Sequence, residues 1–142
     1  CGAFRKWIND CAQTQFVLDE KALDSVRSLA NQTNRTIADL LVQRDLLDRV
    51  DLAIDTYNQL CCLSGTIADL ARLGLLLAKP HPRISPIHQQ MVSALMLTCG
   101  LYEVSSKFAV KVGLPMKSGV SGALLAIVPK QGAIACYSPA ID

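Results

Sequence analysis

The sequence predicts an α+β chain, in which a helical layer is followed by an antiparallel hairpin. Two patterns support this fold class. Up to about residue 98, apolar residues recur at intervals of three and four, as they do on one face of a helix. After residue 108 the pattern changes to two short apolar runs, at 123–128 and 133–137, which are typical of paired strands.

The size and composition of the chain fit one domain. Its 142 residues are 51% hydrophobic and 18% charged, which is enough for a real core. No apolar run approaches the roughly 18 residues of a membrane-spanning helix, so we expect no membrane partner. The net charge of +2 argues against broad nucleic-acid binding. Because the chain begins at Cys1 and stops directly after a strand-like run, we expect that both ends are cut from a longer protein.

Charge is distributed unevenly along the chain. Residues 1–71 carry seven Lys and Arg against ten Asp and Glu, a net charge of −3, whereas residues 72–142 carry seven against two, a net charge of +5. A basic half suits a site for an anionic or oxyanion-forming ligand. It also suits a surface that only pairs with the acidic half, and charge alone leaves both interpretations open.

Several helix boundaries can be predicted from capping signals. Thr66 followed by Asp69 three residues later is a capping box. Ser85 followed by Pro86 is an N-cap with a first-turn proline. Gly100 is expected to end the helix that follows.

The predicted hairpin joins its two strands through a four-residue turn at 129–132. The first strand is apolar at every position rather than at every second one. We therefore expect the sheet to be covered on both faces, partly by the helical layer.

Six cysteines are spread along the chain without any C-x-x-C pair, so we expect reduced thiols that act as small buried hydrophobic residues. Cys61 and Cys62 are adjacent on a predicted helix, where successive side chains diverge. The spacing of His81 and His88 is not typical of zinc ligands. We therefore expect no metal site.

The segment most suggestive of chemistry is the glycine-rich stretch at 112–122. Its Lys117-Ser118-Gly119 tripeptide resembles the K-T-G element of serine β-lactamases and penicillin-binding proteins, which lies at the start of a sheet strand. Glycines at such a place allow a ligand to approach the backbone closely. Taken alone, the tripeptide is a weak signal, and a flexible turn that leads into a strand explains it better.

The sequence around this tripeptide resembles the serine-dependent glutaminases, over about residues 31–142. Asn34-Arg35 within a helix and Tyr57-x-x-x-Cys61 at a helix start both match family segments. Further matching segments lie at 68–71, 97–102, 108–109, 112–115, 117–120 and 138–142.

The resemblance implies a β-lactamase/transpeptidase-like fold, with a helical layer packed on an antiparallel sheet. Residues 1–142 would form a partial glutaminase domain, the C-terminal half, with the nucleophile region missing. The implied reaction hydrolyses L-glutamine, a small-molecule substrate, to L-glutamate and ammonia through a serine acyl-enzyme. The family further implies no cofactor, a cytoplasmic location and a homo-oligomer.

The resemblance also assigns catalytic roles to four residues. The backbone N–H of Val120 would supply one donor of the oxyanion hole, and its side chain would be incidental. Tyr57 would place its phenol near the nucleophile as a proton-transfer partner. Lys117 and Ser118 would add a positive charge and a hydroxyl at the strand edge.

Substrate binding would fall to a second, overlapping group. Asn34 would hold the amino-acid end of glutamine, and Tyr102 would line the substrate pocket together with Tyr57 and Val120. Considered without the family, Tyr57 and Tyr102 are instead expected to be helix-packing aromatics.

Three departures from the family pattern qualify this assignment. No lysine has a serine three residues before it, so the S-x-x-K nucleophile motif is not found in these 142 residues, and neither is the Asn-Ala-Gly-Ala-Ile substrate loop. Arg27 occupies the spacing of the family's substrate-binding glutamate, seven residues before Asn34. Either Glu20 reaches the site from elsewhere or this branch binds glutamine differently. A non-catalytic, truncated or degenerate glutaminase-like scaffold is the alternative function.

Overall fold

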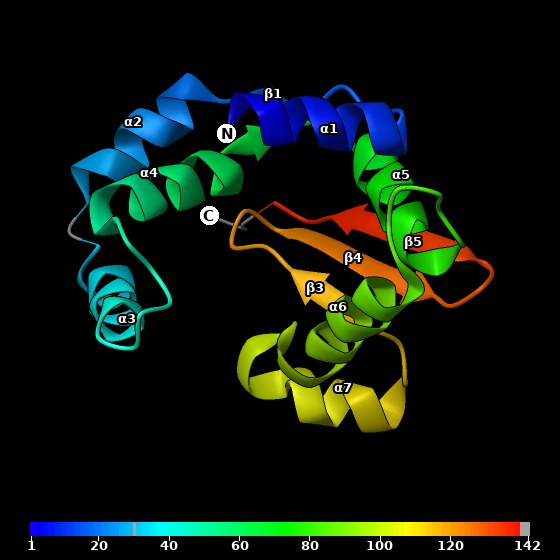
Figure 1. Ribbon diagram of the computed structural model, residues 1–142. Helices are drawn as coiled ribbons and strands as arrows, with labels where there is room; N and C mark the ends of the chain where they lie inside the picture. Colours follow the sequence, from blue (N-terminus) through cyan, green and yellow to red (C-terminus); the bar gives the residue numbers. More distant parts are fainter. Residues whose placement is uncertain (30, 140–142) are drawn as a thin grey trace. The chain divides into compact units, whose positions relative to one another are not determined.

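The computed structural model describes residues 1–29 and 31–139 (Figure 1). The contacts within the chain divide it into two units. Unit 1 comprises residues 1–6 and 16–64, and unit 2 comprises residues 7–15 and everything from residue 65 onward. Helix α1 (Gly2–Ala12) spans the division between them.

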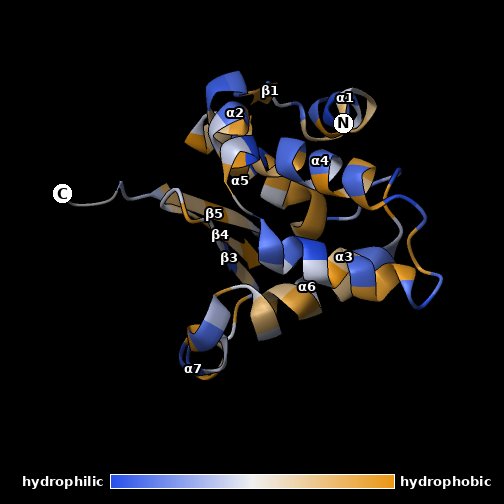
Figure 2. Cartoon of the chain, turned by 90° about the vertical axis from the view of Figure 1, so that its left-hand side faces the viewer, coloured by the Kyte–Doolittle hydropathy of each residue, from blue (hydrophilic) through white to orange (hydrophobic). Residues whose placement is uncertain are grey.

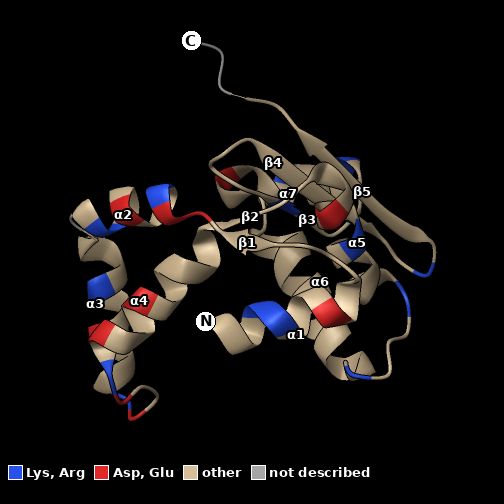
Figure 3. Cartoon of the chain, turned by 90° about the horizontal axis from the view of Figure 1, so that it is seen from above, with Lys and Arg blue, Asp and Glu red and all other residues tan. Residues whose placement is uncertain are grey.

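Unit 1 is helical apart from one small strand pair. Its elements are β1 (Val17–Leu18), α2 (Glu20–Ser28), α3 (Gln32–Val42), α4 (Val50–Cys61) and β2 (Leu63–Ser64). The two strands pair antiparallel, and the sequence patterns did not predict them because two residues are too short to show any alternation. Buried apolar side chains hold the helices together, among them Leu23, Ala38, Ile54 and Cys62. Lys, Arg, Asp and Glu are distributed along all three of these helices (Figure 3).

Unit 2 combines helices with a three-stranded antiparallel sheet, which confirms the predicted α+β class. Its elements are α5 (Ile67–Ala78), α6 (Pro86–Cys99), the 3-10 helix η1 (Tyr102–Val104), α7 (Ser105–Lys111), β3 (Met116–Ser118), β4 (Ala123–Val128) and β5 (Gly132–Tyr137). The strand order is β3-β4-β5, so the predicted hairpin is present and β3 extends it by one strand.

The middle of β4 is covered on both faces, as its continuous apolar sequence predicts. Leu125 and Ile127 pack with Ala78 of α5 and Met96 of α6. Ala126, which points to the opposite face because side chains alternate along a strand, packs in a second cluster with Leu101 and Met116.

Helix α5 lies very close to the sheet at Gly74. A Cβ atom at this position would lie 2.5 Å from the Cβ of Ala133 and 2.8 Å from Cδ1 of Leu125. A glycine inside a helix costs up to about 1 kcal/mol relative to alanine, and this close approach to the sheet explains why it is tolerated.

Helix α6 is apolar around most of its circumference and contains no Asp, Glu, Lys or Arg (Figure 2). Met96 is its one buried residue, whereas Ile87, Met91 and Leu95 are more than half exposed. A helix that is hydrophobic all round is typically buried in a larger core.

The predicted helix boundaries are confirmed, but two of them have a different physical basis. The Thr66 hydroxyl accepts from Asp69 N at 3.1 Å and the Asp69 carboxylate accepts from Thr66 N at 2.9 Å, which completes the capping box. Ser85 precedes Pro86 at the start of α6 but makes no side-chain cap. Gly100 ends α6 with an ordinary φ of −72°, so left-handed backbone does not explain this glycine. A Cβ there would lie 1.8 Å from the carbonyl oxygen of Met116, so strand β3 requires the glycine.

Three other expectations are corrected. Lys117 and Ser118 end the separate strand β3 rather than starting the long apolar strand. The turn between β4 and β5 has three residues, 129–131, and Lys130 takes its left-handed position with φ 65°. Among the cysteines, Cys62 alone is buried, and burial raises the pKa of its thiol, whereas Cys61, Cys99 and Cys136 are exposed.

Within the described ranges, no helix is long and apolar enough to cross a membrane. Over the same residues, no group of three or more His, Cys, Asp or Glu side chains gathers in a way that could hold a metal ion.

Candidate functional site

The structure brings Asn34 and Tyr57 together in one pocket of unit 1. Asn34 lies within a helix, α3, as predicted, and Tyr57 lies in the second half of α4 rather than at a helix start. The pocket has a volume of about 290 Å³. It is lined by Asn34, Ile37, Ala38, Leu41, Leu47, Ala53, Ile54 and Tyr57.

This pocket has the character of a ligand site. Asn34 and Tyr57 supply the two polar side chains among its eight lining residues, and the other six are apolar. An apolar pocket with a few convergent polar groups is the usual form of a small-molecule site. Tyr57 is 53% exposed, so it is not the buried packing aromatic that its helical spacing suggested.

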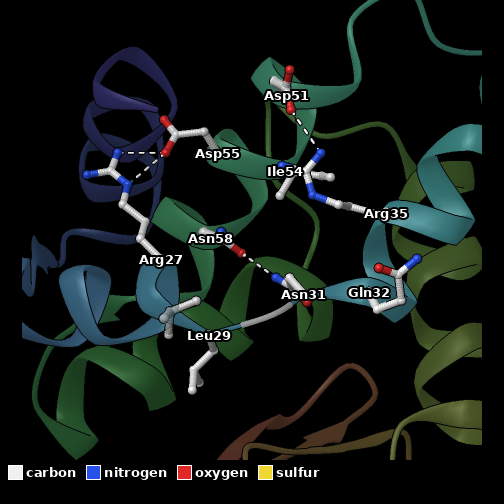
Figure 4. Close-up of a pocket in the computed structure, with 10 residues that line it drawn as sticks. Arg27, Leu29, Asn31, Gln32, Arg35, Asp51, Ile54, Asp55 and Asn58 are labelled. Carbon is white, nitrogen blue, oxygen red and sulfur yellow. Dashed lines mark hydrogen bonds and ion pairs between the residues drawn. The ribbon is translucent and has the colours of Figure 1, made fainter.

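A second pocket of unit 1, about 390 Å³ in volume, is lined by charged and amide side chains (Figure 4). Arg27 donates to Asp55 Oδ1 from Nε at 2.9 Å and from Nη2 at 2.6 Å. Arg35 pairs with Asp51 at 3.1 Å. Figure 4 shows both ion pairs at the pocket wall.

The charges in this second pocket are already matched. The hydrogen bonds from Arg27 and from Gln59 lower the pKa of Asp55, and Asp55 in turn raises the pKa of Arg27. Arg27, which stands seven residues before Asn34, is therefore already paired with the carboxylate of Asp55. Glu20 begins α2 and does not line either pocket.

In unit 2 the structure brings together Tyr102, Lys117 and Ser118. The Nζ atom of Lys117 lies 4.9 Å from the centroid of the Tyr102 ring, within range of a cation–π interaction. The same ammonium group donates a hydrogen bond to the carbonyl oxygen of Ser118. Tyr102 is 59% exposed, so it too is not a buried packing aromatic.

The backbone ties β3 to the segment that carries Tyr102. The amide of Ser118 donates to the carbonyl oxygen of Gly100 at 3.1 Å. Gly100 also allows the carbonyl of Met116 to approach, so the Lys-Ser strand and the Tyr102 segment are held at a fixed spacing.

Val120 lies in a tight turn between β3 and β4, and its side chain is fully exposed. Gly119 N donates to Ala123 O at 2.7 Å, and Gly122 N donates to Gly119 O at 3.0 Å. The Val120 amide has no hydrogen-bond partner among the residues that the structure describes. Gly122 has φ 97°, which favours glycine, and a Cβ there would lie 1.9 Å from Ser138 O. Within the described residues, the turn therefore leaves the backbone N–H of Val120 without a partner. The conformation of the turn requires the glycine at position 122.

The predicted site residues thus form two groups, one in each unit: Asn34 and Tyr57 in unit 1, and Tyr102, Lys117, Ser118 and Val120 in unit 2. The segment predicted at 138–142 is described only at Ser138 and Pro139, and its last three residues lie outside the described residues.

Sequence reasoning missed the ion pairs of the charged pocket and the conformation of Tyr102. Arg27 and Asp55 are 28 residues apart, and Arg35 and Asp51 are 16 apart, so no helical spacing links either pair. Tyr102 has φ 54°, and nothing in the sequence signals a left-handed backbone at a tyrosine.

Comparison with known proteins identifies the family. The family model described as Glutaminase matches residues 1–142. The chain belongs to the glutaminase family. It is 45% identical over 144 residues to a glutaminase from Synechocystis and 40% identical over 117 residues to glutaminase 1 of Halalkalibacterium halodurans.

Solved structures of glutaminases share the fold of this chain. A Bacillus glutaminase crystallised in 4.3 M NaCl superposes over 95% of the chain with a TM-score of 0.82 and 34% identity. A Bacillus subtilis glutaminase with the same TM-score and identity is a covalent complex with 5-oxo-L-norleucine, formed by reaction with 6-diazo-5-oxo-L-norleucine. These neighbours confirm the predicted fold class, a mixed α+β arrangement consistent with part of the β-lactamase-like fold.

The chain spans less than half the length of the curated relatives it matches. All of it matches 44% of the Synechocystis glutaminase, and 77% of it matches 38% of the Halalkalibacterium protein. Of the Bacillus chain crystallised in high salt, it covers 50%.

Proposed function

We propose that this chain is part of a serine-type glutaminase that hydrolyses L-glutamine to L-glutamate and ammonia. The observation that carries the proposal is the match of the Glutaminase family model to all of residues 1–142. The Bacillus subtilis complex supports a covalent mechanism, because its bound 5-oxo-L-norleucine has a carbonyl at C5, the carbon that bears the amide in glutamine.

In the proposed reaction, a serine hydroxyl attacks the side-chain amide carbon of glutamine and forms a tetrahedral oxyanion. The C–N bond then breaks, ammonia leaves after taking up a proton, and a γ-glutamyl ester of the serine remains. Water hydrolyses this ester to glutamate and the free serine. Because the 142 residues contain no S-x-x-K motif, the serine is supplied by polypeptide outside them.

The residues of unit 2 would stabilise charge in this reaction. The free N–H of Val120 would donate to the oxyanion, where a backbone donor is effective because it is fixed before charge develops. Lys117 and Ser118 would add a positive charge and a hydroxyl near it. Tyr102 would line the substrate pocket.

The residues of unit 1 would bind the substrate and move a proton. The phenol of Tyr57 would transfer or orient the proton between the serine and the leaving group. Asn34 would hold the amino-acid end of glutamine. Their position in one small, mostly apolar pocket supports both roles.

The alternative is a non-catalytic glutaminase-like scaffold. The observations that favour it are the lack of S-x-x-K within these residues and the ion-paired Arg27 at the spacing of the family's glutamate. The two functions predict different results in one experiment.

That experiment joins the chain to the rest of a glutaminase. A chimera in which these 142 residues replace the matching segment of the Synechocystis glutaminase is assayed for ammonia release from L-glutamine. We expect turnover that disappears when the supplied S-x-x-K serine is changed to alanine. A folded chimera without turnover would support the scaffold instead.

The 142-residue chain by itself provides a second test. Without the serine it should release no ammonia above background, because the oxyanion donors alone offer no covalent route. Turnover by the isolated chain that Ser118→Ala abolishes would make Ser118 the nucleophile and overturn the assignment of roles.

The proposal includes a location and an assembly state. We propose a cytoplasmic, homo-oligomeric enzyme that needs no metal or organic cofactor. All six cysteines are free, and all of them except Cys62 are at least partly exposed, which suits a reducing compartment. Light scattering of the purified chimera would test the assembly state.

A further inference from the structure

Tyr102 has an unusual backbone for an aromatic residue. Its φ of 54° lies in the left-handed region, which bulky side chains adopt rarely and which is unfavourable for them. Such a conformation persists only where the surrounding structure holds it. Because Tyr102 is 59% exposed, core packing does not fix its ring.

The side chain of Ser105 holds this segment. Ser105 is 3% exposed and is the first residue of α7. Its hydroxyl donates to the carbonyl oxygen of Tyr102 at 2.7 Å and accepts from the amide of Leu101 at 3.0 Å. One buried hydroxyl therefore bridges the N–H of Leu101, the residue before Tyr102, and the carbonyl oxygen of Tyr102 itself. That carbonyl oxygen also accepts from the backbone N–H of Ser105, so the hydroxyl adds the contact to Leu101 that the backbone does not provide.

The tyrosine ring then meets a charge from the neighbouring strand. Ser118 N donates to Gly100 O, which ties β3 to the residues just before Tyr102. Lys117 Nζ lies 4.9 Å from the centre of the Tyr102 ring. A change in the backbone at Tyr102 would carry the ring away from this ammonium group.

We propose that Ser105 is a positioning residue for Tyr102: its buried hydroxyl keeps the Tyr102 backbone left-handed and thereby holds the ring against Lys117. The consequence for glutamine binding rests on the proposed function. The positioning of Tyr102 by Ser105 does not rest on the proposed function, and it can be measured without any enzyme activity.

The first experiment is NMR spectroscopy of the 142-residue chain. Intraresidue couplings should report a positive φ at Tyr102, and the ring should shift the ε-methylene protons of Lys117 upfield. Ser105→Ala should remove both signatures, and Ser105→Thr, which keeps the hydroxyl, should restore them. Ser106→Ala is the matched control, because Ser106 is exposed on the same helix.

The result that overturns the proposal is a folded Ser105→Ala chain in which both signatures remain, or a wild-type chain that never shows them. If Ser105→Ala does not fold, Ser105→Cys keeps a similar side-chain volume but donates and accepts more weakly. Partial loss of both signatures is then expected, and unchanged signatures overturn the proposal.

The second experiment measures kinetics in the Synechocystis chimera. If Tyr102 lines the substrate pocket, its displacement by Ser105→Ala should raise KM more than it lowers kcat, with a loss in kcat/KM of up to about 10²-fold. Ser105→Thr should recover most of this loss. If the role of Ser105 were purely structural, Ser105→Ala would lower the melting temperature without raising KM more than it lowers kcat. An inactive wild-type chimera would count against the proposed function and leave the NMR result to decide the positioning.

Discussion

The two groups of candidate residues are carried by different kinds of backbone. In unit 1, Asn34 and Tyr57 project from regular helices that hold their shape through buried side chains elsewhere. In unit 2, Tyr102 has a positive φ. Val120 lies in a turn whose last residue, Gly122, also has a positive φ. In the helical group the chemistry resides in side chains, and in the turn group much of it resides in the backbone.

This difference predicts how each group responds to substitution. A side chain on a helix can be trimmed without disturbing the helix, so chemistry and folding separate cleanly in unit 1. In unit 2, a substitution that leaves the backbone intact should matter little, and one that changes the backbone should affect activity and stability together.

The largest effect is expected from Val120→Pro in the Synechocystis chimera. Proline removes the amide hydrogen and restricts φ, and the loss of one oxyanion donor typically lowers kcat by about 10²–10³-fold. Val120→Ala keeps the N–H and should stay near the wild-type rate, because the side chain is fully exposed. Steady-state kinetics would contradict the backbone role if Val120→Ala were as impaired as Val120→Pro.

Tyr57→Phe tests the side-chain role assigned to the helical group. The change deletes only the hydroxyl, so a phenol that transfers a proton should cost about 10²-fold in kcat while the fold stays intact. Tyr137→Phe is the matched control, because Tyr137 is also about half exposed but ends strand β5. A Tyr57→Phe chimera with a lower melting temperature and an unchanged kcat would show a structural tyrosine instead.

The same contrast explains which features the sequence could predict. The capping box at Thr66 and the hairpin of β4 and β5 were predictable because each is encoded within a few consecutive residues. The pairing of Arg27 with Asp55 was not, because tertiary packing brings together residues 28 positions apart. The left-handed Tyr102 was missed because a hydroxyl three residues later and a neighbouring strand hold it, and neither leaves a local signal.

For the candidate site, the resemblance identified residue types but not their surroundings. Asn34 and Tyr57 were assigned separately, and only the structure places them in one pocket. The contact of Lys117 with Tyr102 joins two segments whose individual motifs contain no information about each other.

A smaller effect, on stability, distinguishes the two kinds of backbone directly. Gly122→Ala in the 142-residue chain forces a Cβ to within 1.9 Å of Ser138 O on a backbone with φ 97°. We expect a loss of roughly 1–3 kcal/mol in the free energy of unfolding. Asn34→Ala, on a regular helix, should change it by no more than about 0.5 kcal/mol. Urea titrations followed by circular dichroism would measure the free energy of unfolding of both variants. Equal losses would show that the turn and the helix do not differ in their tolerance of substitution.

The smallest expected effect concerns Asp69, which belongs to regular structure although it lies in unit 2. Its carboxylate accepts from the Thr66 hydroxyl at 2.7 Å, from Thr66 N at 2.9 Å and from Gln15 N at 3.3 Å. These hydrogen bonds, those from Thr66 above all, lower the pKa of Asp69. The charged form is therefore favoured in the folded chain.

The sign of the pH dependence follows from that shift. The stabilisation by Asp69 should be complete above the ordinary aspartate pKa of about 3.9 and should be lost as the pH falls through the lowered pKa of the folded state. Asp69→Asn cannot ionise, so the wild-type chain should be more stable than this variant at neutral pH, and the difference should narrow in acid. Urea midpoints measured between about pH 7 and pH 2 would show this convergence, with Asp51→Asn as the control for an exposed ion-paired carboxylate. A difference that stayed constant down to about pH 2 would mean that the capping box does not depend on the charge of Asp69, and that even a helix start in unit 2 is held by its packing. A difference that widened in acid would contradict the lowered pKa of Asp69 itself.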